Sequence, residues 1–299
     1  MRDFAGDAWQ TLSMSTTSSA VLALAENELA HAQEVANVTM RELHDAHEAA
    51  EASLLLDNVW NVGKAGTTQL EPGLLVALAH SGNYVGGAFD NETDELIGVT
   101  VGFFGRPLGK AMHSHIAGVR HDQVGRGTGA AMKLHQRLWC LNHGIMQMTW
   151  TFDPLIARNA AFNFRKLGVH FVDYYQDFYG QMRDGVNAGQ ASDRMMVSWS
   201  LDRAPKETSS KLLDTIDDLD MNYALHVGES GEPVESDVPR STKYAALQIP
   251  ADVETLRGAD AELATQWRHA LRRGIVQLTQ DGWDLAGLRK DNTYIFTHD

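Results

Sequence analysis

Cysteine, proline and long apolar runs are scarce in this chain, which has 1 Cys and 7 Pro among 299 residues. A single Cys140 excludes an internal disulfide and a zinc site built on cysteines, and it suits a reducing cytoplasm. We expect Cys140 to be a small buried side chain inside a helix. No apolar run approaches the roughly 18–20 residues of a bilayer-spanning helix, and the start lacks the pattern of a signal peptide, so no membrane association is expected.

Positive charge is also in short supply. The chain has 25 Lys and Arg against 39 Asp and Glu, a formal net charge of -14. Such a charge repels phosphate backbones and argues against a nucleic-acid partner, whereas a small basic substrate such as an amine is tolerated. Hydrophobic residues make up 43% of the chain, enough for one large domain or two ordinary domains with a proper core.

Periodicity predicts helices first and then a series of strands. Residues 1–20 end in a Ser/Thr cluster and read as a disordered tail. Apolar residues at helical spacing predict helices at 21–36, 44–60, 74–80, 130–143, 159–167 and 259–280. Strand patterns are predicted at 38–41, 84–89, 96–104, 112–119, 146–152, 169–175, 194–201, 244–249, 284–288 and 293–296. Eight acidic residues and no basic residue between 214 and 237 predict a solvated linker.

A glycine-rich segment between a strand and a helix is the most informative stretch. It reads Gly125-Arg126-Gly127-Thr128-Gly129 and follows the strand predicted at 112–119. Glycines let backbone N–H groups approach an anion closely, and the positive end of the following helix points at the same place. The segment therefore predicts a ligand that carries phosphate, with a simple strand-to-helix turn as the alternative.

Two other phosphate-binding motifs fit this chain less well. Gly109-Lys110 is followed by Ala111 and lacks the upstream glycine of a Walker A loop. The dinucleotide fingerprint fits Gly125-x-Gly127-x-x-Ala130, with Asp153 at the end of the next strand. That fingerprint should open an alternating parallel domain, whereas strands joined by short turns precede it here. A nicotinamide-dependent oxidoreductase therefore remains an alternative function.

Several segments together resemble the GNAT superfamily of CoA-dependent N-acyltransferases. The resemblance covers about residues 38–201, and its motifs lie at 113–119, 125–129, 149–155, 159–168 and 178–180. The chain is most similar to a branch of larger GNAT-like proteins with an extra C-terminal portion. The resemblance implies an α/β (α+β) fold with a mixed, mostly antiparallel sheet flanked by helices, and an acyl-CoA co-substrate.

The resemblance also implies which residues hold the cofactor. The backbone of Ala117, Gly118 and Val119 would pair with the pantetheine arm. The CoA pyrophosphate would be held by residues of the glycine-rich segment: Gly125, Arg126, Gly127, Thr128 and Gly129. Asn159 or Asn163 would approach the pantetheine or the adenine from the second cofactor-contacting helix.

Two positions depart from the family pattern. Val124 stands where the motif usually has Gln or Arg, with Gln123 one place early. Phe164 stands where many GNAT enzymes have the Tyr that protonates the departing thiolate, and Phe has no proton to give. Either another Tyr therefore replaces it, or water protonates the departing thiolate, or the protein binds acyl-CoA without turning it over.

Catalytic candidates follow from the chemistry of acyl transfer, because only a neutral amine attacks a thioester and a base must accept its proton. Asp153 is the first candidate, with a helix cap as its alternative role. His115 is the second, with a hydrogen-bonded interior histidine as the alternative. Tyr174, Tyr175 and Tyr179 follow the Asn-bearing helix, and we name Tyr175 as a donor that replaces the missing tyrosine, with aromatic packing as the alternative role of each.

Arginines supply the remaining expectations. Arg194 is expected to pair with a substrate carboxylate, with a surface ion pair as the alternative. Arg268, Arg272 and Arg273 are expected on a solvated helix face beside a core stripe. His113 and His115 share one face of a strand, but with no obvious third ligand we expect no metal.

The leading functional hypothesis is a cytoplasmic N-acyltransferase that moves an acyl group directly from acyl-CoA to a small amine or amino acid. Acetyl is the default acyl group, and succinyl is considered as well. An acyl-CoA sensor without turnover is the alternative that Phe164 motivates. We expect residues 21–201 to form the acyl-CoA-binding domain, 202–243 an acidic linker and 244–299 an extension packed on the core, with a homodimer as one allowed assembly.

Overall fold

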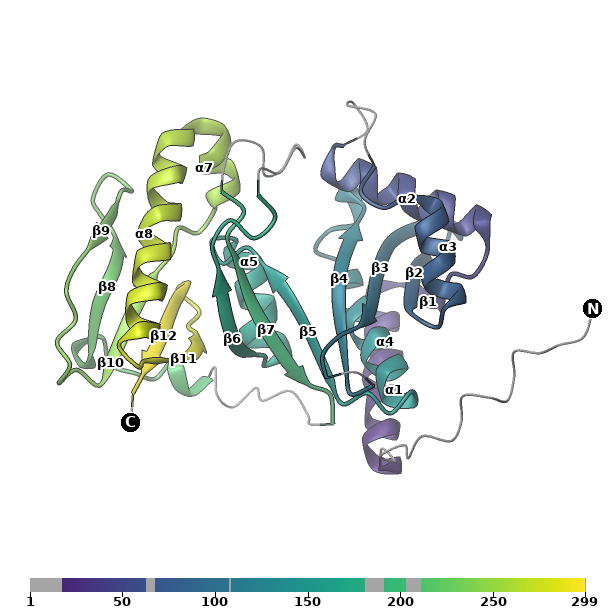
Figure 1. The fold of residues 1–299 in the computed structure, drawn as a ribbon, viewed down its shortest axis with the longest axis horizontal. Helices are drawn as coiled ribbons and strands as arrows, with labels where there is room; N and C mark the ends of the chain where they lie inside the picture. Colours follow the sequence, from purple (N-terminus) through teal and green to yellow (C-terminus); the bar gives the residue numbers. More distant parts are fainter. Residues whose placement is uncertain (1–17, 63–67, 108, 181–190, 203–210, 299) are drawn as a thin grey trace, which may run out of the picture.

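Two β-sheets and the helices packed on them make up the fold (Figure 1). The structure, a computed structural model, describes residues 18–62, 68–107, 109–180, 191–202 and 211–298. The first sheet has seven strands in the order β1-β2-β3-β4-β5-β7-β6, and the second has five in the order β11-β12-β10-β8-β9. Among the described strands, only β4–β5 and β8–β10 pair in parallel, so the predicted class of mixed, mostly antiparallel α/β fold is confirmed.

The elements of the first sheet follow the predicted periodicities closely. Its strands are β1 (Val38–Glu42), β2 (Tyr84–Asp90), β3 (Leu96–Phe104), β4 (Ala111–Val119), β5 (Gln147–Phe152), β6 (His170–Tyr175) and β7 (Arg194–Ser200). Its helices are α1 (Ser19–Ala36), α2 (Ala46–Trp60), α3 (Pro72–His80), α4 (Thr128–Asn142) and α5 (Ala157–Ala160), with a short 3-10 helix η2 (His121–Gln123) and a π-helix η3 (Ala161–Leu167). Where one helix was predicted at 159–167, α5 continues as a π-helical segment over η3.

Helices cover the first sheet through separate apolar clusters. Leu56 of α2 and Leu75 of α3 pack with Val99 of β3 in one cluster. A second cluster joins Leu29 of α1 and Met132 of α4. Cys140 of α4 is fully buried, as predicted, and burial raises the pKa of its thiol. No helix among the described residues has the length and apolarity needed to cross a membrane.

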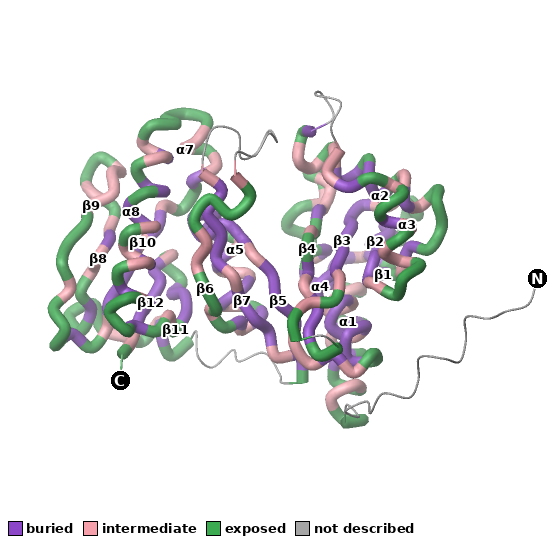
Figure 2. The backbone as a smooth tube through the Cα atoms, viewed as in Figure 1, coloured by how far each residue is buried: buried purple, intermediate pink, exposed green. Residues whose placement is uncertain are grey.

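The C-terminal part builds the second sheet around one long helix. Its elements are η4 (Asp218–Asp220), β8 (Met221–Val227), β9 (Pro233–Glu235), β10 (Tyr244–Gln248), α7 (Val253–Ala259), α8 (Ala261–Gln280), β11 (Asp284–Leu288) and β12 (Thr293–Thr297). Trp267 of α8 and Tyr294 of β12 lie in the same buried cluster as Trp150 and Phe164 of the first part, and Figure 2 shows buried backbone on both sides of the contact.

The prediction of a solvated linker over 202–243 is wrong where β8 and β9 lie. Met221 and Leu225 are buried and alternate with more exposed neighbours, the ordinary pattern of a half-buried strand. The run of acidic residues around them hid this period of two. The predicted tail lies outside the described residues up to position 17, and Ser18 caps α1 with its side chain.

Candidate functional site

A wedge between β4 and β5 defines the site. The two strands pair only over their first residues, and the last pair is His113 with Thr149. Beyond it β4 runs on to Val119 and β5 to Phe152, and the strands separate as Figure 1 shows. Because the parted strands leave their facing edges unpaired, a ligand can lie between them.

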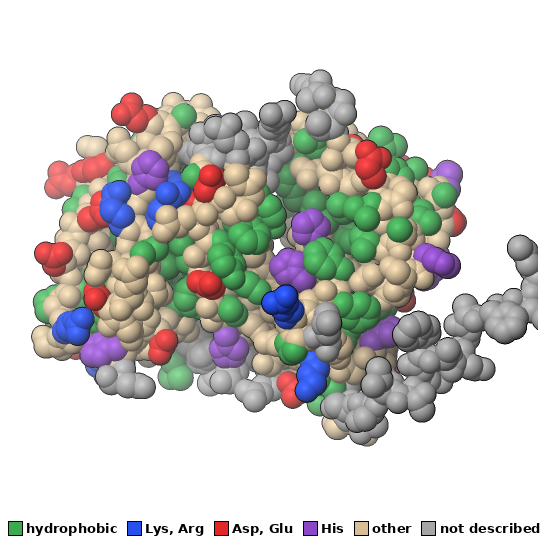
Figure 3. Space-filling view, viewed as in Figure 1, with side chains coloured by type: hydrophobic (Ala, Val, Ile, Leu, Met, Phe, Trp, Pro, Cys, Tyr) green, Lys and Arg blue, Asp and Glu red, His purple; other side chains and the backbone are tan. Residues whose placement is uncertain are grey.

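A cavity of about 730 Å³ fills this wedge and extends to the start of α4. Figure 3 shows a hollow between the two sides of the molecule, with hydrophobic and histidine side chains beside it. The cavity brings together most of the predicted site residues, which are His115, Ala117, Gly118, Val119, Gly125, Thr128, Gly129, Asp153, Asn159, Asn163 and Arg194. Tyr175, Arg126 and Gly127 are not among its lining residues.

The glycine-rich segment presents free backbone donors at one end of the cavity. The N–H groups of residues 125–129 donate to no acceptor in the described part of the chain. Gly125 has a φ of 89° and Gly127, which caps α4, a φ of 98°, so both need glycine for their conformation. Gly129 lies within α4, and a Cβ there would meet no atom within 4 Å. Unpaired amides at a helix start favour an anion.

Three other residues predicted to contact the cofactor have contacts within the protein. Asn163 accepts a hydrogen bond from Trp150 Nε1 at 3.1 Å, so it fixes one wall of the cavity. An added Cβ at Gly118 would lie 2.7 Å from the Trp60 ring, so this glycine allows α2 to pack close to β4. Arg126 does not line the cavity; it hydrogen-bonds to Gln123, which does, and lies 3.9 Å from Asp90.

Asp153 is held by arginines of the C-terminal part. Arg268 donates to both of its carboxylate oxygens at 2.6 Å, and Arg257 donates to one of them at 2.6 Å. The carboxylate also accepts a hydrogen bond from the Leu155 N–H in the turn before α5. It does not cap that helix, whose N-cap residue is Ile156. Burial acts to raise the pKa of Asp153, but the charges of Arg268, Arg257 and Arg194 outweigh it and hold this pKa well below its usual range. A carboxylate so stabilised is a poor proton acceptor.

His115 is placed better for proton transfer. It lies on β4 and lines the cavity. Desolvation lowers its pKa below the ordinary value, so the imidazole is neutral near pH 7. Its neighbour His113 hydrogen-bonds to Thr149 at 3.3 Å, and desolvation with the nearby His115 and Lys133 lowers the pKa of His113 to about 4. No group of three His, Cys, Asp or Glu side chains in the described residues is arranged to hold a metal.

The tyrosines take different places from those predicted. Tyr175 directs its hydroxyl to Met196 Sδ at 3.4 Å, and Tyr174 donates to Asp193 at 2.6 Å. Tyr179 is the tyrosine that lines the cavity, 3.3 Å from Thr151 Oγ1. Phe164 is buried between Phe152 and Tyr294, with ring centroids at 6.3 and 5.9 Å, and serves the core.

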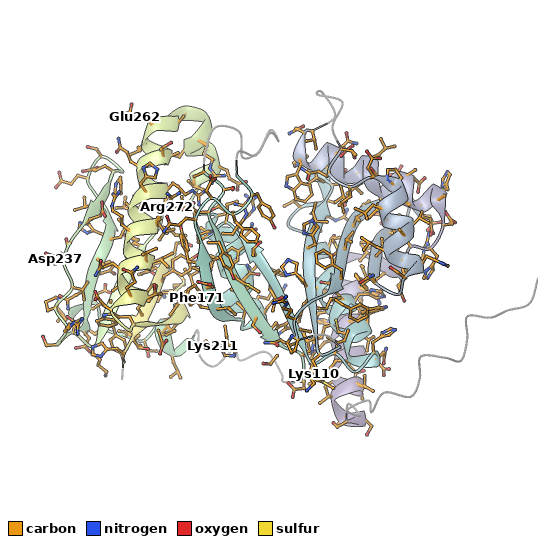
Figure 4. The ribbon with its side chains drawn as sticks, viewed as in Figure 1. Lys110, Phe171, Lys211, Asp237, Glu262 and Arg272 are labelled. Atoms are coloured by element: carbon orange, nitrogen blue, oxygen red, sulfur yellow. The ribbon has the colours of Figure 1, made fainter. Side chains whose placement is uncertain are left out.

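Arginines gather at the side of the cavity formed by β5 and β7. Arg194 is 8% exposed, lines the cavity and lies over the Tyr179 ring at 5.5 Å. The prediction of a solvated face for Arg268 and Arg272 is wrong, because Arg268 binds Asp153 and Arg272, labelled in Figure 4, binds Asp193 at 2.6 and 2.8 Å. Arg273 does stay exposed, paired with Glu235.

Lys133 is a buried, charged cavity residue that the sequence analysis did not predict. Its Nζ donates to Ser114 Oγ at 2.6 Å and to Gln136 Oε1 at 3.2 Å, and the side chain is buried. No role was predicted for Lys133, because lysine side chains are mostly exposed to solvent. A signal was present in Cys140, an apolar residue seven positions later on the same helix face.

Comparisons with known proteins give partial likenesses only. No protein-family model matches the chain, and no curated protein matches it. Among solved structures, the chain is similar to an acetyltransferase of the GNAT family from Streptococcus pneumoniae, at 12% identity over 55% of this chain and 99% of that chain, with a TM-score of 0.43. It is similar to the ribosomal-protein-S18-alanine N-acetyltransferase from Escherichia coli, at 11% identity over 56% and 97%, with a TM-score of 0.43.

A third similar structure is a GNAT superfamily phosphinothricin acetyltransferase from Sinorhizobium meliloti in complex with AcCoA. The identity is 17% over 57% of this chain and 95% of that chain, and the TM-score is 0.45. These proteins include members of the family that the sequence motifs resemble. Similarity at this level of identity and TM-score does not establish an activity for this chain.

Proposed function

We propose that this protein is an acyl-CoA-dependent N-acyltransferase that transfers its acyl group directly to a small amine. The observation that carries the proposal is the continuity of the cavity, which joins Gly125, Thr128 and Gly129 of the glycine-rich segment to the unpaired edge of β4 and the wedge beside β5. A pyrophosphate suits the first part, an extended amide-bearing arm suits the second, and a thioester suits the third.

His115 is the proposed base. Its imidazole is neutral near pH 7 and lines the cavity, so it can take the proton that the attacking nitrogen loses. Asp153, the first candidate from the sequence, is instead assigned to holding Arg268 and Arg257 against the first sheet. Tyr175 has no place in the proposed mechanism because it does not line the cavity.

Arg194 supports an acceptor that carries a carboxylate, such as an amino acid. Its guanidinium lies at the cavity beside β5 and β7, and burial lowers its pKa while leaving it a cation at neutral pH. Acetyl is the proposed acyl group, with succinyl as the competing choice. Arg194 would also suit the extra carboxylate of succinyl-CoA.

Thermal shift measurements with acetyl-CoA, succinyl-CoA and NAD test this proposal. A ligand at about a hundred times its Kd adds roughly 2.7 kcal/mol of stability, a clear rise in Tm. We expect stabilisation by an acyl-CoA and none by NAD. Stabilisation by NAD alone would overturn the proposal in favour of an oxidoreductase. If acetyl-CoA stabilises the protein but no CoA is released in the presence of any amine, the protein is an acyl-CoA sensor without turnover.

A further inference from the structure

Lys133 closes the narrow end of the cavity. Its Nζ lies 2.6 Å from Ser114 Oγ and 4.1 Å from the centroid of the Trp150 ring. Ser114 and Trp150 are the first residues of their strands beyond the last β4–β5 pair. The nitrogen therefore sits between the two strands at the point where they part, and all three residues line the cavity.

The inference rests on the proposed function. If that function holds, the sulfur of the CoA thioester is expected where β4 and β5 part. An arm anchored at the amides of residues 125–129 runs along the edge of β4 from Val119 toward Ser114. At the rise of a β-strand those residues span about 17 Å, so an extended arm ends deep in the wedge. The acyl carbonyl and the sulfur then lie near Lys133.

The departing thiolate needs a proton, and the residue that the family resemblance would supply is missing. Phe164 has no acidic proton and lies in the core. The hydroxyls of Tyr174 and Tyr175 make contacts away from the cavity, with Asp193 and Met196. Among the described lining residues, Tyr179 carries a phenol and Lys133 an amine that could give the proton. Tyr179 lies beside Thr151 of β5, whereas Lys133 lies where the strands part.

We propose that Lys133 is the general acid of the acyl transfer, and that its ammonium protonates the sulfur of CoA as the C–S bond breaks. The acceptor nitrogen forms the new C–N bond and loses one proton to His115. His115 releases that proton to solvent, and neutral Lys133 takes one proton back from solvent. Each turnover therefore consumes acyl-CoA and amine and yields amide and CoA with no net change in the enzyme.

The surroundings of Lys133 suit a group that gives up a proton near neutral pH. Burial lowers the pKa of Lys133 to about 7, and it forms no ion pair with a described carboxylate. The titratable groups that face it are Cys140 on α4 and His113 on β4. Both are neutral near pH 7, because burial raises the pKa of Cys140 and lowers that of His113. Its neighbours on β5, Met148 and Trp150, do not titrate.

Lys133→Met and Lys133→Arg variants of the full chain test the assignment. Release of CoA from acetyl-CoA is followed with a mixture of the twenty amino acids, and with hydroxylamine as an acceptor that needs no recognition. Methionine fills a similar volume beside Met148, and arginine keeps the charge but does not give up its proton. Lys243→Met, at an exposed lysine that does not line the cavity, is the matched control.

Loss of the general acid should lower kcat about 100-fold or more in both variants, because acid catalysis contributes at least that factor. The Kd for acetyl-CoA should stay within about threefold, and Lys243→Met should match the wild type. The wild-type kcat should fall as pH rises above about 7, where Lys133 loses its proton. Neither Lys133 variant should show that alkaline decrease.

A second measurement reports the proton on Lys133 without any turnover. In the unfolded chain this lysine titrates near 10.5, so between about 7 and 10.5 the unfolded state binds more protons than the folded state. Stability of the wild type relative to Lys133→Met should therefore rise with pH across that window, seen as a growing difference in Tm. A difference that stays constant with pH would overturn the assignment.

The kinetic outcomes separate this inference from the proposed function. A kcat of Lys133→Met within about threefold of wild type would overturn the role of Lys133 and leave the acyltransferase standing. A 100-fold loss in Tyr179→Phe with none in Lys133→Met would move the role to Tyr179. If the wild type binds acetyl-CoA but releases CoA no faster than the uncatalysed rate, Lys133 is not a general acid and the protein is an acyl-CoA sensor. Failure of wild type to bind any acyl-CoA would overturn both.

Discussion

Asp153 at the end of β5 and Arg268 in α8 form a buried bidentate ion pair, with both N···O distances at 2.6 Å. The two residues are 115 positions apart in the sequence, so the pair joins the C-terminal part to the strand that forms one wall of the cavity. The carboxylate that looked like a catalytic base is thus bound by the part of the chain that lies beyond the resemblance.

Asp153→Asn should therefore act on stability. Removing one charge of a buried pair leaves Arg268 without its partner, and such losses cost about 3–5 kcal/mol. Denaturant unfolding should show this loss, whereas Asp237→Asn at an exposed acid, labelled in Figure 4, should change stability little. If the Asp153→Asn protein is as stable as the wild type and its kcat no longer falls at low pH, Asp153 is the base instead of His115.

The same pair predicts a pH dependence of folding. The pKa of Asp153 is held below its unfolded value of 3.8, so its contribution is complete above that pH and is lost as pH falls through the folded pKa. The wild type should lose more stability than Asp153→Asn as the solution is acidified below about pH 4. Equal acid sensitivity in thermal melts of the two proteins would contradict the ion pair.

His115→Gln should lower kcat by about 100-fold, since general base catalysis contributes 10²–10⁴. The base works in its neutral form, so wild-type kcat should also fall as pH drops through the pKa of His115, which lies below 6.5. Steady-state rates of CoA release across pH check both statements. His47→Gln on α2, with 82% of its side chain exposed, is the control, and an unaltered acid limb in His115→Gln would assign the base elsewhere.

Arg194→Gln should discriminate between acceptors. A charged hydrogen bond to a carboxylate is worth about 1.5–3 kcal/mol, so KM for an amino acid acceptor should rise about 10- to 100-fold. KM for the same acceptor without its carboxylate should change little, as should the Kd for acetyl-CoA. Arg273→Gln, at an exposed arginine paired with Glu235, provides the comparison. An equal rise for both acceptors would refute carboxylate recognition by Arg194.

Trp267→Ala tests whether the C-terminal part folds as one unit with the first sheet. Trp267 is fully buried in the cluster that contains Trp150 and Phe164, so its truncation should cost about 3–5 kcal/mol. Unfolding should remain a single transition by circular dichroism and by calorimetry. Leu219→Ala, at a side chain that is 93% exposed, should behave as wild type. Separate transitions for the two parts would show that they fold independently.

Local patterns in the sequence predicted most elements and the glycine-rich turn at one end of the cavity. Alternation identifies the strands β4 and β5, and helical spacing identifies α4. The glycines at 125, 127 and 129 mark the turn from β4 into the start of α4. These features depend on residues close together in the chain, which is why they can be read without a structure.

Contacts between distant residues could not be predicted in this way. Lys133 looks like an exposed lysine until Ser114 and Trp150 are brought to it from two strands. Asp153 looks like a free carboxylate until Arg268 folds against it. Burial and pairing across the sequence set the charge state of both groups, and neither follows from spacing.

The central claim is that the amides at the start of α4 hold the pyrophosphate of an acyl-CoA, and Gly129→Glu tests it most directly. Gly129 is helical, and open space surrounds its Cβ position, so the variant should fold, whereas Gly127 with a φ of 98° would be strained by any side chain. The new carboxylate places a negative charge where the phosphates would lie.

Calorimetric titration of acetyl-CoA should show a Kd raised by at least about 100-fold in Gly129→Glu, an effect of about 3 kcal/mol. Gly129→Gln, which has the same shape without the charge, should lose much less affinity. A folded Gly129→Glu protein that binds acetyl-CoA as tightly as the wild type would contradict the account, because the glycine-rich segment would then be only a turn.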